Sequence, residues 1–142
     1  MNKRRSLFWI VYMLFFLLTC RSSYADDAAV KNAVAASDTW LIFVDNGQYS
    51  KSWETAAEYF KIALGKEQWD QTLKAVRKPL GKVIKRQIKS KQYTTNLPGA
   101  PDGEYVVIQY ETSFENKKSS IETVTPMLDN DGKWRVSGYY IK

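Results

Sequence analysis

The chain contains no histidine, and its single cysteine is Cys20. The lack of histidine removes the side chain that most often acts as a general base near neutral pH and the one that most often binds transition metals. One cysteine cannot form a disulfide within the chain, so the fold must be held together by its core. Walker, nucleophile-elbow and zinc-ligand motifs are missing as well. The sequence therefore indicates no cofactor, no metal site and no catalytic residue that a motif would identify.

Residues 1–25 have the pattern of a bacterial secretory signal peptide. Residues 3–5 form a cationic head, residues 7–18 are an uninterrupted apolar run, and small residues stand three and one positions before a possible cleavage site. The apolar run is shorter than the roughly 20 residues that span a bilayer. We therefore expect cleavage after Ala25 and an exported, periplasmic protein that begins at Asp26.

Two other interpretations of this segment stay open. Cys20 follows Leu-Leu-Thr, which resembles the lipobox of bacterial lipoproteins, although Thr19 stands where a smaller residue is usual. The protein would then be a lipoprotein anchored at Cys20, and only in that case do we expect contact with the membrane. The Arg4-Arg5 pair resembles the twin-arginine export signal, but Lys3 replaces the usual Ser or Thr.

The charge of the whole chain is a poor guide to its partners. The 142 residues include 21 Lys plus Arg and 15 Asp plus Glu, which gives a net charge of +6. Four of the basic residues and none of the acidic ones fall in the signal peptide, so the predicted mature protein has 17 basic and 15 acidic residues. A nearly neutral exported chain without a readout motif predicts no nucleic-acid partner. Residues 26–142 suffice for a single domain with one core.

Apolar residues at helical spacing predict three helices in the first half of the mature chain. The first covers residues 26–44 and ends at an Asp-Asn-Gly sequence. The second covers residues 50–64 and carries Trp53 and Phe60 on one buried face, and the third covers residues 69–80. Replacing Trp53 with alanine is then expected to cost about 3–5 kcal/mol because it leaves a cavity.

The second half of the chain changes to the alternating pattern of β-strands. Strands are expected over residues 82–96, 104–114, 121–128 and 133–141, with turns at residues 116–119 and 130–132. In the second of these strands, Ile108 and Tyr110 face one side and Glu111 faces the other. The lysine-rich first strand suits a sheet edge. Together the elements predict an α+β fold in which three N-terminal helices pack on a curved antiparallel sheet of about four strands.

Five short sequences form a recognisable set along the mature chain. They are Trp40-Leu41, Asp45-x-Gly47-x-Tyr49-x-x-Ser52-Trp53, Arg77-x-x-Leu80-Gly81, Leu97-Pro98-Gly99-Ala100-Pro101-Asp102-Gly103-Glu104-Tyr105 and Asp131-Gly132-x-Trp134-Arg135-Val136-x-Gly138-Tyr139-Tyr140-Ile141. In these sequences the chain resembles the bacterial domain-of-unknown-function family 4019. The resemblance implies a small exported α+β domain similar to the cone-shaped nuclear-transport-factor-2-like folds. The family has no established activity, so the resemblance supplies no catalytic residues.

Four tryptophans are many for a mature domain of this size. Each has apolar neighbours at helix or strand spacing, so packing in the core accounts for them. The functional alternative is a ligand cavity between the helices and the sheet, because mostly apolar clefts are common ligand sites. A small apolar ligand would fit such a cavity. Its candidate lining residues are Trp40, Trp53, Phe60, Tyr110 and Tyr140.

Residues 71–101 contain many basic residues and no acidic ones. A solvated helix and edge strand would explain this run without any function. The functional alternative is a surface for an anionic component of the cell envelope, such as a phospholipid surface, a polyanionic glycan or an acidic protein. The candidate residues of this surface are Lys74, Arg77, Lys78, Lys85, Arg86, Lys89 and Lys91.

Catalysis would have to use carboxylates, and none of them forms a recognisable pair in the sequence. The candidates are Asp45, Glu58, Glu111 and Glu122, with Tyr110 or Arg77 in support. The Asp-Asn-Asp-Gly sequence at 129–132 resembles a calcium loop but lacks the closing bidentate glutamate, so we interpret it as a hairpin turn.

We therefore expect a periplasmic binding or accessory module without catalytic residues. The alternative is a small hydrolase or isomerase that uses a carboxylate and a tyrosine in a cone-type cavity. A buried carboxylate bonded to Tyr or Arg would favour the enzyme, and a dry aromatic cavity would disfavour it.

Overall fold

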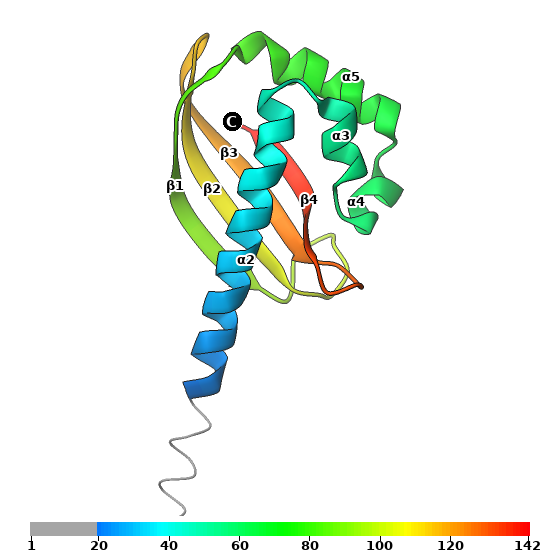
Figure 1. Ribbon diagram of the computed structural model, residues 1–142, viewed down its shortest axis with the longest axis vertical. Coiled ribbons are helices and arrows are strands. Elements are labelled where there is room, and N and C mark those ends of the chain that lie inside the picture. Colours follow the sequence, from blue (N-terminus) through cyan, green and yellow to red (C-terminus); the bar gives the residue numbers. More distant parts are fainter. Residues whose placement is uncertain (1–19) are drawn as a thin grey trace, which may run out of the picture.

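Helices from the first half of the chain cover one face of a four-stranded antiparallel sheet in the computed structural model, which describes residues 20–142 (Figure 1). This arrangement confirms the predicted α+β class and the four strands. Most of the predicted signal peptide, residues 1–19, lies outside the described residues. Within residues 20–142, no helix is both long and apolar enough to span a membrane.

The first described helix, α2 (Cys20–Asp45), contacts all four strands, and its first turns project beyond the sheet (Figure 1). It begins before the predicted start at Asp26 and ends close to the predicted end. Its sheet-facing side is buried as the helical spacing predicts, with Trp40 3 % and Leu41 1 % exposed. Gly47 has a φ of 70°, the left-handed conformation expected of a residue that ends a helix.

The single helix expected over residues 50–64 is instead two short helices, α3 (Tyr49–Glu54) and α4 (Glu58–Ala63). The break lies at Ala57, which has an extended backbone with ψ of 151°. Its N–H donates to the carbonyl of Val136 in the last strand, at 2.8 Å, rather than to the preceding helical turn. Trp53 and Phe60 therefore lie on different helices, and only Phe60 is fully buried.

The third predicted helix corresponds to α5 (Lys66–Val76), followed by a 3-10 turn, η1 (Lys78–Leu80). Trp69 and Leu73, which share one face of α5, are both buried. The chain then turns into the sheet at Gly81, where φ is 76° and ψ is −158°. That backbone region is almost restricted to glycine. A Cβ atom at this position would also lie 2.5 Å from Oε2 and 3.0 Å from Cβ of Glu115.

Replacing Gly81 with alanine is expected to lower the free energy of unfolding by about 3 kcal/mol, because backbone strain and a close approach act together. Gly47→Ala is the matched control, since Gly47 also has positive φ but has no neighbouring atom within 4 Å of an added Cβ. It is expected to cost about 1–2 kcal/mol. Urea unfolding of both variants makes the comparison. Equal losses at the two positions would show that the approach of Glu115 contributes nothing.

The sheet is an antiparallel meander in the order β1-β2-β3-β4. Its strands are β1 (Val83–Thr94), β2 (Tyr105–Phe114), β3 (Lys117–Leu128) and β4 (Trp134–Ile141). The alternation predicted for β2 is confirmed, because Ile108 and Tyr110 are buried and Glu111 is exposed. The turn predicted at 116–119 is shorter than expected, so that Lys117 and Lys118 belong to β3. The register of β1 is interrupted between Val83 and Lys85 and again between Ile88 and Ser90.

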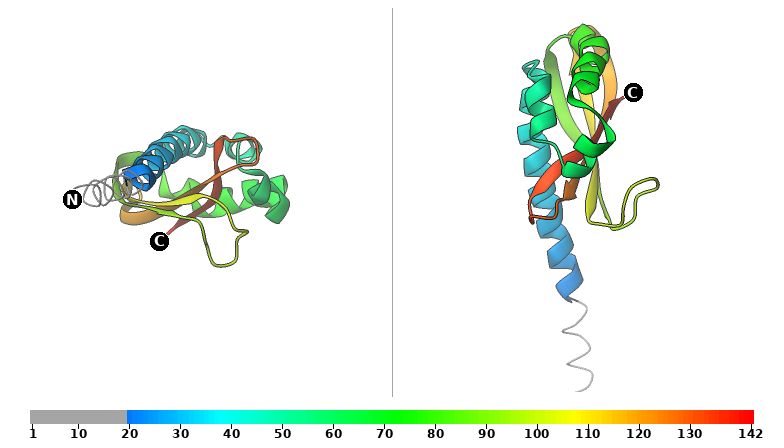
Figure 2. Two further views of the ribbon diagram at one scale, coloured as in Figure 1. Left: turned by 90° about the horizontal axis from the view of Figure 1, so that it is seen from below. Right: turned by 90° about the vertical axis from the view of Figure 1, so that its right-hand side faces the viewer.

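The helices of residues 20–142 lie on one side of the sheet, which we call the inner face, and none of them covers the other side, the outer face (Figure 2). Strands β1 and β4 form the two edges. Helix α3 packs against both α2 and α5 over the β4 side. The core therefore lies between the inner face and the helices, and the described helices leave the outer face uncovered.

Aromatic side chains dominate this core and are fixed by hydrogen bonds to Ser52. The Trp40 indole donates to the Ser52 carbonyl at 2.7 Å, and the Trp69 indole donates to the Ser52 hydroxyl at 2.9 Å. Trp69 meets the ring of Phe60 edge to face at 5.0 Å, and Trp40 meets Tyr139 in the same way at 5.3 Å. Such edge-to-face pairs add to the energy of burial, so the rings define how the helices sit on the sheet.

Candidate functional site

The structure distributes the predicted cavity residues over two faces of the protein. Trp40, Phe60 and Tyr110 are 3 %, 7 % and 2 % exposed and pack in the core, with Trp53 partly buried against them. Tyr140 is 55 % exposed and alternates with the core residue Tyr139 along β4. Four of the five candidate residues therefore lie together in or against the core, and Tyr140 lies apart from them.

One polar group of the predicted cavity is buried with its partners. The Tyr110 hydroxyl lies 2.9 Å from a carboxylate oxygen of Asp38, to which it donates, and 3.0 Å from the hydroxyl of Ser37. Burial raises the pKa of Tyr110 above its ordinary value, so the phenol stays protonated and acts as a donor at neutral pH. This contact attaches the middle of α2 to β2.

Near the C-terminal end of α2, four charged side chains form a largely buried network, which we call the charged network. Its members are Asp45 of α2, Arg77 after α5, Arg86 of β1 and Glu122 of β3. The Arg86 guanidinium lies between the two carboxylates: Nε donates to Glu122 at 2.7 Å and Nη1 donates to Asp45 at 2.7 Å. Arg77 donates to Asp45 at 3.1 Å. Two positive charges therefore balance two negative ones.

Glu122 is the most enclosed member, with no exposed surface. Besides Arg86, it accepts hydrogen bonds from the Thr112 hydroxyl at 2.6 Å and from the Tyr139 hydroxyl at 2.6 Å. Burial and the nearby Glu122 charge raise the pKa of Tyr139 well above its ordinary value, which keeps this phenol protonated. Both oxygens of the carboxylate are thus occupied by donors, as a buried charge requires.

Arg77 is held by several groups besides Asp45. Its Nη1 donates to the Gly81 carbonyl at 2.7 Å, and its guanidinium carbon lies 4.6 Å from the centre of the Phe114 ring. The side chain is only 3 % exposed. Its Nε and the hydroxyl of Ser120 are buried without a protein hydrogen-bond partner. The charged network therefore joins the end of α5, the end of α2 and strands β1 and β3.

Four open surface grooves among the described residues bear on ligand binding. One, of about 480 Å³, lies between α2 and β4 and is lined by Trp40, Phe43 and Trp134. Another, of about 510 Å³, lies on the outer face of β1, β2 and β3. Two more involve the loop before β2 and the β3-β4 hairpin. None of the four is lined by a member of the charged network.

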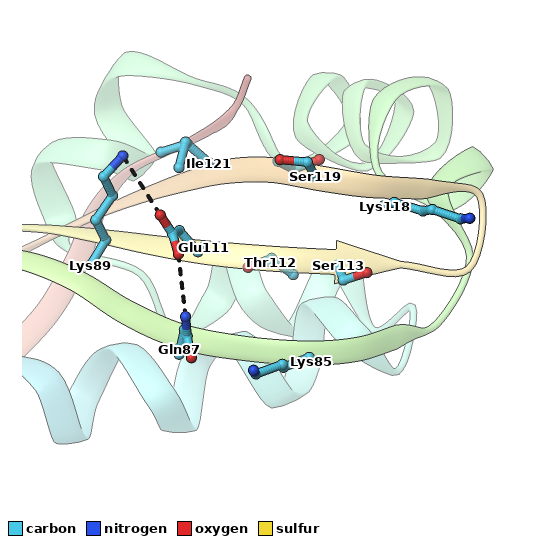
Figure 3. Close-up of a pocket in the computed structure, with 10 residues that line it drawn as sticks. Lys85, Gln87, Lys89, Glu111, Thr112, Ser113, Lys118, Ser119 and Ile121 are labelled. Carbon is cyan, nitrogen blue, oxygen red and sulfur yellow. Dashed lines mark hydrogen bonds and ion pairs between the residues drawn. The ribbon is translucent and has the colours of Figure 1, made fainter.

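The groove on the outer face, which we call the outer groove, is polar and basic (Figure 3). Lys85 and Lys89 reach it from β1 and Lys118 from β3. Glu111 is the one acidic residue in its lining. It forms an ion pair with Lys89 at 3.8 Å and accepts a hydrogen bond from the side-chain amide of Gln87 at 3.2 Å. The hairpin end of the groove is thus left with uncompensated positive charge.

The predicted basic surface is divided by the fold into three groups. Arg77 and Arg86 are enclosed in the charged network. Lys74 pairs with Asp70 on α5 at 2.5 Å, and Lys78 is exposed on the helical side. Lys85 and Lys89 line the outer groove, whereas Lys91 pairs in register with the inward-facing Ile108 and is exposed at the sheet edge.

The remaining candidate carboxylates lie on the surface. Glu58 pairs with Lys61 at 3.0 Å, and both belong to α4. In the β3-β4 hairpin, Arg135 binds Asp131 at 2.7 Å and Asp129 at 3.2 Å. The Arg135 hydrogen bond holds the pKa of Asp131 well below its usual range. Among the described residues, no three His, Cys, Asp or Glu side chains come together where they could hold a metal ion.

Sequence reasoning named Asp45, Arg77 and Glu122 but did not join them, and it placed Arg86 on the surface. The alternation of β1 contained part of the missing signal, because Arg86 shares its side of the strand with Ile88, and the two pair in register with the buried Thr112 and Tyr110 of β2. Lys118 was missed because the expected turn included it. Three-dimensional pairing of β1 with β2 and β3 is needed to bring these groups together.

Two comparisons with known proteins bear on the chain. A family model described as "Protein of unknown function (DUF4019)" matches residues 36–139. The matched residues run from the middle of α2 to β4 and include the whole charged network and the outer groove. A search of curated proteins finds no match.

Proposed function

The chain belongs to the DUF4019 family, and we propose that it is an exported, periplasmic binding or accessory module without catalytic activity. The signal-peptide pattern of residues 1–25 supports export. The helix-covered curved sheet supports a likeness to the cone-shaped nuclear-transport-factor-2-like folds. Lipid attachment at Cys20 is the alternative route by which the protein would be held in the envelope.

One observation carries the non-catalytic part of this proposal: the groups that could perform acid-base chemistry are saturated by one another. The carboxylates of Asp45 and Glu122 receive their hydrogen bonds from Arg77, Arg86 and neighbouring hydroxyls. A general base must instead reach a proton of a bound substrate. None of the four grooves reaches these carboxylates, whereas the outer groove presents lysines that are free to bind.

The buried Glu122 also supports a second candidate function, a small hydrolase or isomerase. A buried carboxylate with tyrosine and arginine beside it is an arrangement used in acid-base catalysis. The two functions give different results with Glu122→Gln in a screen of ester and isomerase substrates. If the protein is a binding module, neither the wild type nor the variant turns over any substrate. If it is an enzyme, the wild type turns over a substrate and the variant does not.

Export has its own test in the mass of the protein recovered from cells that express the full chain. We expect release by osmotic shock and an intact mass that corresponds to Asp26–Lys142, because cleavage follows Ala25. A mass that begins at Cys20 and includes a lipid adduct would establish the lipoprotein instead. Retention of Met1 in a cytoplasmic protein would contradict export altogether.

A further inference from the structure

We propose that the outer groove is a docking surface for anionic phospholipid headgroups, with Lys85, Lys89 and Lys118 as the contacting cations. The inference rests on the proposed binding function and names its partner. It concerns the outer face of the sheet, which the helices leave uncovered, and involves no member of the charged network (Figure 3).

Among the described residues, carboxylates compensate the positive charge of this surface only in part. Lys85 and Lys118 form no ion pair with a described carboxylate. Lys89 and Glu111 are each 50 % exposed and lie 3.8 Å apart, so water screens their attraction and a stronger anion can replace Glu111. Neutral hydroxyls of Ser113 and Ser119 lie between the lysines and can donate to phosphate oxygens.

The spread of the lysines favours an extended anionic surface over a single bound anion. They come from two strands separated by β2, and the groove is open, so one phosphate group would remain largely solvated. Near an anionic bilayer each basic residue strengthens binding about fivefold, or about 1 kcal/mol. Three lysines that engage different headgroups at once then give about a hundredfold.

The lining favours lipid headgroups over an acidic protein segment. A bound peptide gains specificity from pockets that receive alternate side chains. The outer groove instead has a mostly polar lining of lysine, serine, glutamine and threonine, with Ile121 as its one large apolar member. Anionic headgroups require only positive charge and hydroxyl donors on an accessible face, and the outer face presents both.

Co-sedimentation with vesicles tests the proposal, using protein purified from cells that express the full chain. We expect binding to equimolar phosphatidylglycerol and phosphatidylcholine vesicles and none to phosphatidylcholine alone. The variant Lys85→Gln with Lys118→Gln should bind about 25-fold more weakly, because it loses two fivefold contributions. Binding should also weaken as salt shortens the Debye length to about 8 Å at physiological ionic strength.

The matched control is Lys31→Gln with Lys78→Gln, which makes the same change in net charge at two exposed positions away from the groove. We expect its affinity to stay within twofold of the wild type. Equal losses in the two double variants, or no wild-type binding at low salt, would overturn the proposal. A tenfold loss caused by millimolar inorganic phosphate at constant ionic strength would also overturn it, since it would indicate a discrete phosphate site. Turnover in the substrate screen would contradict the proposed non-catalytic function, but it would not change the vesicle-binding result, which tests the docking surface separately.

Discussion

Replacing Arg86 with methionine is expected to lower the free energy of unfolding by about 3–5 kcal/mol, as measured by urea denaturation at neutral pH. Methionine keeps much of the aliphatic volume of arginine but none of its charge. Glu122, which has no exposed surface, would then keep two hydroxyl donors and lose its only cation. The loss therefore measures a charge left without compensation in the interior.

The neighbouring residue supplies the control for this substitution. Lys85→Met lies one position away on β1 and removes the same charge, but Lys85 faces the outer groove and has no carboxylate partner among the described residues. Its effect on stability should stay within about 0.5 kcal/mol. The double variant Arg86→Met with Glu122→Leu should lose less than the sum of the single losses, because each single substitution strands a charge. Additive losses would show that Arg86 and Glu122 do not depend on each other.

Replacing Trp69 with alanine is expected to cost about 3–5 kcal/mol through lost contacts and the cavity left behind. Trp69 is 3 % exposed, lies against Phe60, Trp40 and Tyr139, and donates to the Ser52 hydroxyl. Its removal would also leave that hydroxyl without one of its partners. Thermal or urea unfolding gives the value.

Tyr140→Ala is the control, because Tyr140 is an aromatic residue that was predicted for the same cavity yet is 55 % exposed. It should cost less than about 1 kcal/mol. The loss of stability in Trp53→Ala should fall between these two values. It should be smaller than the ~3–5 kcal/mol expected from the sequence because Trp53 is only partly buried, and larger than the loss at Tyr140 because its indole donates a hydrogen bond to the Leu64 carbonyl. A loss at Tyr140 as large as that at Trp69 would contradict the division into a packed core and an open outer face.

Local patterns were enough to predict the class of fold and most elements of the chain. A helix and a strand that each bury one side show this in the spacing of their apolar residues. Examples are Trp40, Leu41 and Val44 at helical spacing in α2, and Ile108 and Tyr110 at alternate positions in β2. The helix break at Ala57 could not be predicted in this way. It depends on a hydrogen bond to Val136, which lies far along the chain and reaches Ala57 only after the sheet has formed.

The candidate site was less predictable than the fold, because its residues lie far apart in the sequence and come into contact only in the folded protein. Arg86 and Lys85 look alike in the sequence, yet one is enclosed between Asp45 and Glu122 and the other faces solvent. Strand alternation separates them once β1 is paired with β2. The position of Lys118 depends on the length of the β2-β3 turn, where a difference of two residues moves a lysine from a loop to the outer groove.

Crosslinking in intact cells tests the central claim, that this protein is a binding module which works through its outer face. A photo-crosslinking amino acid at position 119 lies in the outer groove, and one at position 67 lies on the exposed side of α5 as a control. We predict phospholipid adducts, identified by mass, from position 119 and not from position 67, and their loss in the variant with Lys85→Gln and Lys118→Gln. Adducts of the same kind from both positions, or no lipid adduct from position 119, would contradict the account.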